Sequence, residues 1–130
     1  MENKPEIRSE PTTIKELLES AVEKTKRLHE EAYPILWEQL DSDLYLSKLK
    51  ERAKVIIDIP NKVDELVERG EMIPKHELIA LQNLAFMAKE AIDKNNDFHL
   101  GVLLIDRGSR DGDPNQLERI LQRLYPPKST

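Results

Sequence analysis

Oxygen-bearing side chains recur at short intervals near the C-terminus of this 130-residue chain. Asp111, Asp113 and Glu118 supply carboxylates, Asn115 supplies an amide oxygen, and Gly112 stands among them. Calcium binds about six to eight carboxylate, amide, carbonyl or water oxygens. Oxygen ligands at this spacing around a glycine could therefore hold a calcium ion, provided that the segment forms a loop between two helices.

The spacing resembles an EF-hand calcium loop, with Gly112 at the sixth of its positions and Glu118 at the last. However, Arg107 stands where the family has its first carboxylate, and Asp106 is one residue out of register. Pro114 occupies the eighth position. A cation at the first position repels calcium, so we interpret the segment as a polar surface loop ending in a helix N-cap and expect no metal site.

A second motif joins Arg69 to His76, with six residues between them. This spacing is similar to the Arg-x(4–6)-His signature of small all-α HEPN ribonucleases, in which both residues face one active site from a helix. Gly70 and Pro74 lie between the two residues here, and both types favour a helix boundary. The ribonuclease is therefore a minor alternative to two solvated residues at helix ends.

The other residues give catalysis little support. His29 and His99 lack a partner at the spacing that places two metal ligands on one helix face. The chain has no cysteine, no glycine-rich phosphate loop and no nucleophile elbow. We expect a protein that is not an enzyme, needs no cofactor and does not depend on an oxidising compartment.

Two aromatic residues, Tyr33 and Trp37, lie close together around Pro34, where a helix should break. Trp and Tyr are favoured interface anchors because they bury a large area at little cost in entropy. We take Tyr33, Ile35, Leu36 and Trp37 as candidates for a protein interface. The alternative is that Trp37 is the largest residue of the core.

Basic residues form the second candidate surface, for the backbone of a nucleic acid. They are Lys48, Lys50, Arg52, Lys54, Arg107, Arg110, Arg119 and Arg123. The net charge of -5 excludes a uniformly basic surface but not a local patch. In size and all-α character the chain resembles the small subunits of CRISPR effector complexes, which implies contact with a nucleic-acid backbone. The alternative is charge that is simply solvated, as on most helix faces.

Composition and periodicity indicate the elements that would position these residues. Leucine, glutamate and lysine are frequent and glycine is rare, which favours helices. Thr13 and Glu16 form a capping-box pattern that opens a first helix. We expect it to run to about Tyr33 and to end or kink at Pro34, because proline disfavours helical geometry in the residue before it.

Asp41, or one of the two residues after it, can cap the next helix. Whether residues 35–59 form one helix or two stays open. We expect this element to stop at Pro60, and Asn61 to cap a short helix that ends before Gly70.

Met72 could supply the hydrophobic contact of that C-cap, and Pro74 suits the first position of the following helix. This helix is apolar over more than half of its circumference, so we expect it to be central, with neighbours on every side. Its expected core residues are Leu78, Leu81, Leu84, Ala85, Ala88 and Ile92.

Residues 98–105 can be a buried strand or a short helix capped by Asp97. We prefer the helix, because a lone strand would have no partner for its backbone groups. Asp113 should cap the last helix, with Pro114 first and Gln116 three residues after the cap.

Together these patterns predict an all-α, single-domain bundle of five or six helices with short Pro and Gly connections. The domain should span residues 12–125, after a polar leader (1–11) and before a flexible tail (126–130). No apolar run approaches the roughly 20 residues that span a bilayer. We expect a cytoplasmic, non-catalytic interaction protein, a small subunit or adaptor that binds protein partners or itself, with a nucleoprotein subunit as the alternative.

Overall fold

The computed structural model of this chain describes residues 11–95, 97–104 and 114–126. Within these ranges the fold is all-α, as predicted. The elements in chain order are α1 (Ile14–Pro34), the π-helical turn η1 (Ile35–Gln39), α2 (Ser42–Glu68), α3 (Lys75–Asp93), α4 (Asp97–Gly101) and α5 (Gln116–Leu124). The leader and the tail predicted from the sequence lie almost wholly outside the described residues.

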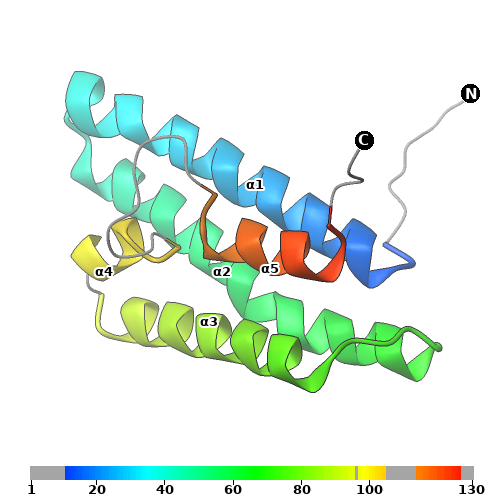
Figure 1. Ribbon diagram of the computed structural model, residues 1–130. Coiled ribbons are helices and arrows are strands. Elements are labelled where there is room, and N and C mark those ends of the chain that lie inside the picture. The colour runs from blue at the N-terminus through cyan, green and yellow to red at the C-terminus, as the bar shows by residue number, and fades with distance from the viewer. Residues whose placement is uncertain (1–10, 96, 105–113, 127–130) are drawn as a thin grey trace, which may run out of the picture.

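The long helix α2 is the centre of the bundle (Figure 1). It packs against α1 on one side and α3 on the other, and consecutive long helices run in opposite directions. The short helix α5 lies between α1 and α3 and contacts both, while α4 contacts α2 and α3. Short connections between antiparallel neighbours are the usual way in which helical bundles are built.

The N-terminus of α1 is held by local and distant acceptors. The Thr13 hydroxyl accepts from the Glu16 N–H at 3.1 Å, as the capping-box pattern predicts. The Glu16 carboxylate accepts from the Thr12 N–H at 3.0 Å. Glu71, from the connection after α2, accepts from the Ile14 N–H at 2.8 Å. A tertiary contact thus satisfies one of the amide groups that the helix itself leaves unbonded.

Pro60 does not end a helix, and this prediction was wrong. It lies inside α2, which continues past Asn61 without a separate helix there. Proline in a helix interior costs about 3 kcal/mol through a lost hydrogen bond and a steric clash. Ile56, Ile59 and Val63 are almost fully buried around it, on one continuous stripe. Their burial, at about 1.5–3 kcal/mol for each side chain, outweighs the cost.

Gly70 closes α2 as predicted, with a φ of 111° in the left-handed region that favours glycine. Its N–H donates to the Val67 carbonyl and the Glu71 N–H donates to the Leu66 carbonyl, both at 3.0 Å. This pair of bonds is a Schellman motif. Met72 does not complete it, because Met72 is one residue too late and is 87% exposed.

The helix α3 begins at Lys75, with Pro74 as its N-cap rather than its first residue. Of the expected core residues, Leu81, Leu84 and Ala88 are buried. Those that are only partly buried are Leu78, Ala85 and Ile92. The prediction that α3 has neighbours on every side is wrong. This helix lies at the edge of the bundle, and its outer face exposes Ile79, Phe86 and Met87.

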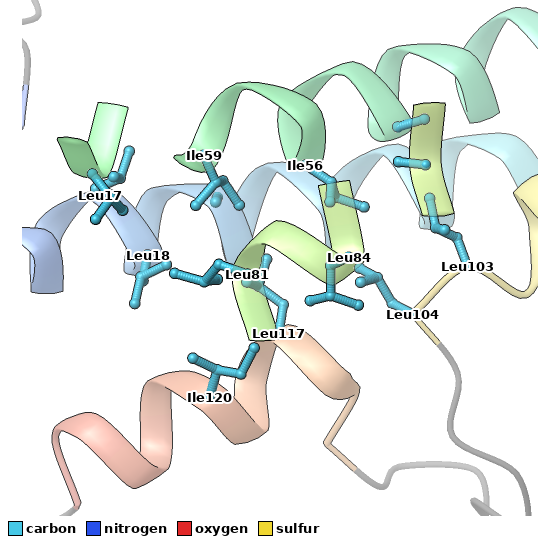
Figure 2. Packing of buried hydrophobic residues seen from close by; sticks show 14 of the residues in the cluster. Leu17, Leu18, Ile56, Ile59, Leu81, Leu84, Leu103, Leu104, Leu117 and Ile120 are labelled. Carbon is cyan, nitrogen blue, oxygen red and sulfur yellow. The ribbon is translucent and has the colours of Figure 1, made fainter. Parts of the chain in front are cut away.

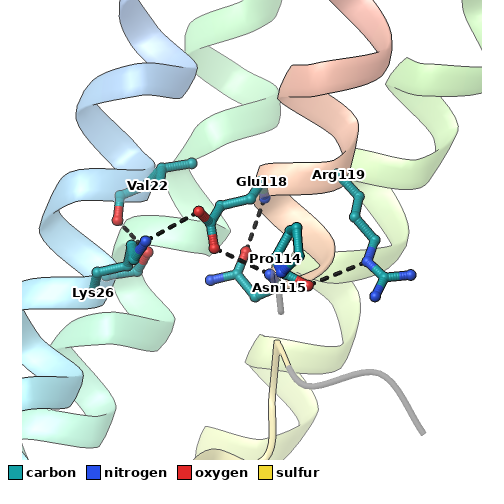
Figure 3. A network of polar contacts seen from close by, with 7 residues as sticks. Val22, Lys26, Pro114, Asn115, Glu118 and Arg119 are labelled. Carbon is teal, nitrogen blue, oxygen red and sulfur yellow. Dashed lines mark hydrogen bonds and ion pairs between the residues drawn. The ribbon is translucent and has the colours of Figure 1, made fainter. Parts of the chain in front are cut away.

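The preference for helix over strand at the next segment is confirmed, because residues 97–101 form α4 and residues 102–104 a turn. The final helix starts later than predicted. Its N-cap is Asn115, while Asp113 lies outside the described residues. Asn115 and Glu118 form a full capping box, and Lys26 binds the second Glu118 oxygen at 3.0 Å (Figure 3). Leu117 and Ile120 form the buried face of this helix.

One hydrophobic cluster joins the five α-helices (Figure 2). Leu18 of α1, Ile56 of α2 and Leu81 of α3 are at most 1% exposed. Leu104, in the turn after α4, is 2% exposed, and Leu117, in α5, is fully buried in the same cluster. The short C-terminal elements are therefore part of the core and not appendages to a three-helix frame.

Candidate protein-interaction site

Four apolar side chains are exposed where α1 turns into α2, at one end of the bundle (Figure 1). The exposed fraction is 49% for Tyr33, 71% for Trp37, 78% for Leu40 and 39% for Leu44. We call these four residues the apical patch. Single exposed apolar residues are ordinary, but a group of them that includes Trp and Tyr is typical of a binding surface.

The sequence predicted part of this patch. Tyr33 and Trp37 are exposed, so the interpretation of Trp37 as a core residue is wrong. Ile35 is only 6% exposed and therefore packs into the bundle instead of facing a partner. The side chain of Leu36 lies outside what the structure describes.

Pro34 determines how the patch is presented. The helix α1 ends at Pro34, as predicted, because proline has no N–H to continue the helical ladder. The chain then makes the wider turn η1, which closes when the Leu40 N–H donates to the Ile35 carbonyl. Asp41 follows as the N-cap of α2, its carboxylate accepting from the Leu44 N–H at 3.0 Å. Residues 35–59 therefore form two elements.

Leu40 combines exposure with an unfavourable backbone. Its φ of 53° and ψ of 35° are left-handed, a conformation that costs a residue with a side chain about 1–2 kcal/mol. Among the described residues the other non-glycine with positive φ is Asn95, a type that tolerates this region. Neither burial nor backbone preference accounts for a leucine at position 40.

Sequence reasoning missed Leu40 and Leu44 as site residues. An apolar residue directly before an N-cap usually packs against the helix four residues after the cap, here at Tyr45. That rule predicts that Leu40 packs against the helix α2, yet most of the surface of Leu40 is exposed to water. The signal that identifies it, a positive φ, exists only in the folded backbone.

The described members of the basic candidate set lie in separate places. Lys48 is paired with Glu31 of α1 at 3.0 Å. Arg123 of α5 forms a two-pronged pair with Glu77 of α3, each bond 2.8 Å long, and this hydrogen bonding lowers the pKa of the buried Glu77 carboxyl. Arg119 donates its Nε hydrogen to the Pro114 carbonyl at 3.2 Å (Figure 3).

The remaining basic residues do not join these positions into one basic surface. Arg107 and Arg110 lie outside the described residues. Lys50 is partly buried, and the exposed Lys54 lines a groove of about 610 Å³ between α1 and α2. Carboxylates of Glu16 and Asp58 line the same groove, so it is not uniformly positive.

Arg52 is buried, with 3% of its surface exposed, and cannot reach a nucleic acid in this conformation. One of its terminal nitrogens donates to the carbonyls of Leu100 and Gly101 at the end of α4. The other lies 3.2 Å from Nδ1 of His29, whose ring stacks edge-on against Tyr33. Burial and the neighbouring Arg52 lower the pKa of His29, and Glu30 raises it by less.

This geometry predicts acid sensitivity. Nδ1 of His29 can accept from Arg52 only while the ring is neutral. Because folding lowers the pKa of His29, the unfolded chain takes up its proton first as the pH falls below about 6.5. The contribution of His29 to the free energy of unfolding should therefore be fully present well above pH 6.5 and be lost as the pH falls below that value. Chemical denaturation at several pH values measures this.

The matched variant is His29→Gln, which keeps a hydrogen-bond acceptor but does not titrate. It should flatten the profile just below pH 6.5, where the histidine of the unfolded chain takes up its proton, while leaving carboxylate effects at lower pH. An equally steep profile in this variant would show that other groups cause the acid sensitivity.

The two enzyme and metal motifs do not assemble as their families require. Arg69 is the C-cap of α2 and His76 lies in the first turn of α3, so the pair is not carried by one helix. In the calcium-like segment, most of the expected ligands lie outside the described residues. Asn115 and Glu118 bond to each other's backbone in the capping box of α5 (Figure 3). Among the described residues there is no group of three metal-binding side chains.

Comparison with protein-family models, with curated proteins and with solved structures finds no match for this chain. Within the described residues, none of the helices is long and apolar enough to cross a membrane. The apical patch, defined by its exposure and its backbone, is therefore the basis for a functional proposal.

Proposed function

We propose that this chain is a non-catalytic interaction protein, a small subunit or adaptor that binds a protein partner through the apical patch. The observation that carries the proposal is Leu40, a large apolar side chain that is 78% exposed on a strained backbone. Strain held at an exposed position stabilises nothing within the bundle, and such strain is concentrated at functional sites. The neighbouring Trp37 supplies the type of anchor that dominates interface energies.

A cytoplasmic location, drawn from the absence of cysteine, accompanies this proposal as a prediction. The nucleoprotein alternative and the minor ribonuclease alternative stay predictions too. Neither gains support from the basic residues or from the Arg69 and His76 pair, whose described members lie apart or at separate helix ends.

Replacing Leu40 separates stability from binding. Asparagine tolerates the left-handed region far better than leucine does, so Leu40→Asn should raise the free energy of unfolding by about 1 kcal/mol. The same change should weaken partner binding, because it removes an apolar contact. Urea denaturation measures the first effect. A destabilised Leu40→Asn variant would mean that the leucine contributes to the bundle itself.

The binding part is tested by a photocrosslinking residue, p-benzoylphenylalanine, placed at position 37 in cells that make the protein. A discrete adduct is expected from position 37, and Leu40→Asn should reduce its yield. The control probe replaces Gln82, which is exposed on α3. No adduct at position 37, or equal adducts from both positions, would overturn the proposal. An adduct of twice the chain's mass would identify a second copy as the partner.

A further inference from the structure

The apical patch has a charge pattern as distinct as its apolar content. Between residues 30 and 47 the chain contains five acidic residues and no lysine or arginine. The acidic residues are Glu30, Glu31, Glu38, Asp41 and Asp43. All five are exposed, and in the chain they either precede the four apolar residues of the patch or lie between them.

Two of these five carboxylates make contacts within the fold. Glu31 is paired with Lys48, and the Asp41 carboxylate caps α2. Glu38 lies in the turn η1 beside Trp37, and Asp43 lies in the first turn of α2 beside Leu44. These two exposed residues flank Leu40 in the chain, and we call them the negative rim.

An apolar centre with a negative rim selects its partner by charge. It repels the phosphates of nucleic acids and of anionic lipids, and it repels the same patch of a second copy. Lysine and arginine side chains match the rim, while an apolar stripe matches Trp37 and Leu40. An amphipathic helix offers both features on one face, as in helix-in-groove recognition.

We infer that the apical patch binds a basic amphipathic helix of a protein partner. This inference rests on the proposed function and makes it specific: the apolar stripe of the partner covers Trp37 and Leu40, and its basic residues pair with Glu38 and Asp43. Trp37 is the only tryptophan of the chain, so its fluorescence reports directly on this site.

The test uses a synthetic 18-residue amphipathic helix of leucine and lysine without tryptophan. Its addition to the full chain should shift the Trp37 emission to shorter wavelength and protect Trp37 from acrylamide. The matched peptide with glutamate in place of lysine should do neither. Binding should weaken several-fold between about 50 and 300 mM salt, because screening acts on exposed charges.

Two chain variants are needed for the charge argument. Glu38→Gln with Asp43→Asn should weaken binding of the lysine peptide about three- to tenfold at low salt. Asp64→Asn with Glu65→Gln removes the same charge from an exposed part of α2 far along the helix and should have a smaller effect. Equal losses from both pairs would show only general attraction to an acidic protein and would overturn the inference.

Two further variants test the apolar contact. Leu40→Asn should weaken binding of the lysine peptide several-fold, while Phe86→Ser, on the exposed face of α3, should leave it unchanged. No response of Trp37 to the lysine peptide, or an equal response to the glutamate peptide, would overturn the inference, as would a comparable response to single-stranded RNA or phosphatidylserine vesicles.

The outcomes separate the two proposals. If position 37 gives a specific adduct in cells but the lysine peptide does not bind, the patch is an interface, but its partner is not a basic amphipathic helix. If the peptide binds but position 37 gives no adduct, the proposed function fails although the surface has the inferred preference.

Discussion

Leu117→Ala is expected to lower the free energy of unfolding by about 2–5 kcal/mol, the usual cost of truncating a buried leucine. Leu117 is fully buried in the cluster that joins α1, α3 and α5 (Figure 2). The helix α5 has only nine residues, too few to be stable without packing. The variant should therefore release α5 before the three long helices unfold.

Denaturation monitored by circular dichroism measures the global loss, and hydrogen exchange measures the local one. Amides of residues 116–124 should exchange faster by a larger factor than those of α2. Gln122→Ala, at an exposed position of the same helix, is the control and should change stability by less than about 0.5 kcal/mol. Equal acceleration in α2 and α5 would show that α5 does not open separately.

Arg52→Ala is expected to cost about 2–4 kcal/mol, because it leaves a cavity and removes the donor to two carbonyl groups. Those carbonyls belong to Leu100 and Gly101, at the C-terminal end of α4. The positive charge of Arg52 is favourable there, since helix C-termini carry partial negative charge. Loss of Arg52 should therefore loosen α4 more than the long helices.

Two further variants divide this effect into its parts. Arg52→Met restores most of the volume without the hydrogen bonds, so it should recover part of the stability. Arg52→Lys keeps a charge but cannot reproduce the fork of the guanidinium group. Hydrogen exchange at residues 97–104 follows α4. If Arg52→Met were as stable as the original chain, the bonds to Leu100 and Gly101 would contribute nothing net.

Much of the local structure was readable from the sequence. The cap at Thr13, the end of α1 at Pro34 and the turn at Gly70 depend on a few neighbouring residues, and all three are present. The error at Pro60 has a tertiary cause. Pro60 breaks a helix by local preference, but the burial of Ile59 before it and Val63 after it carries the helix through it.

The candidate site was only partly predictable for the same reason. Two aromatic residues beside a helix break indicated where a surface could be, and Tyr33 and Trp37 are exposed there. The position of Arg52 among other basic residues in the sequence did not indicate that Arg52 is buried. Its burial depends on α4 lying against α2. Exposure is a property of packed elements, and residue type alone does not fix it.

By itself the sequence determined the all-α class and most of the caps, because helix propensity, capping and proline geometry act within a few residues. Only the tertiary structure decided that α3 lies at an edge, that Arg52 is buried and that Leu40 is strained and exposed. These features depend on which helix faces meet across the bundle. Their energies come from contacts between residues far apart in the chain, which local patterns do not record.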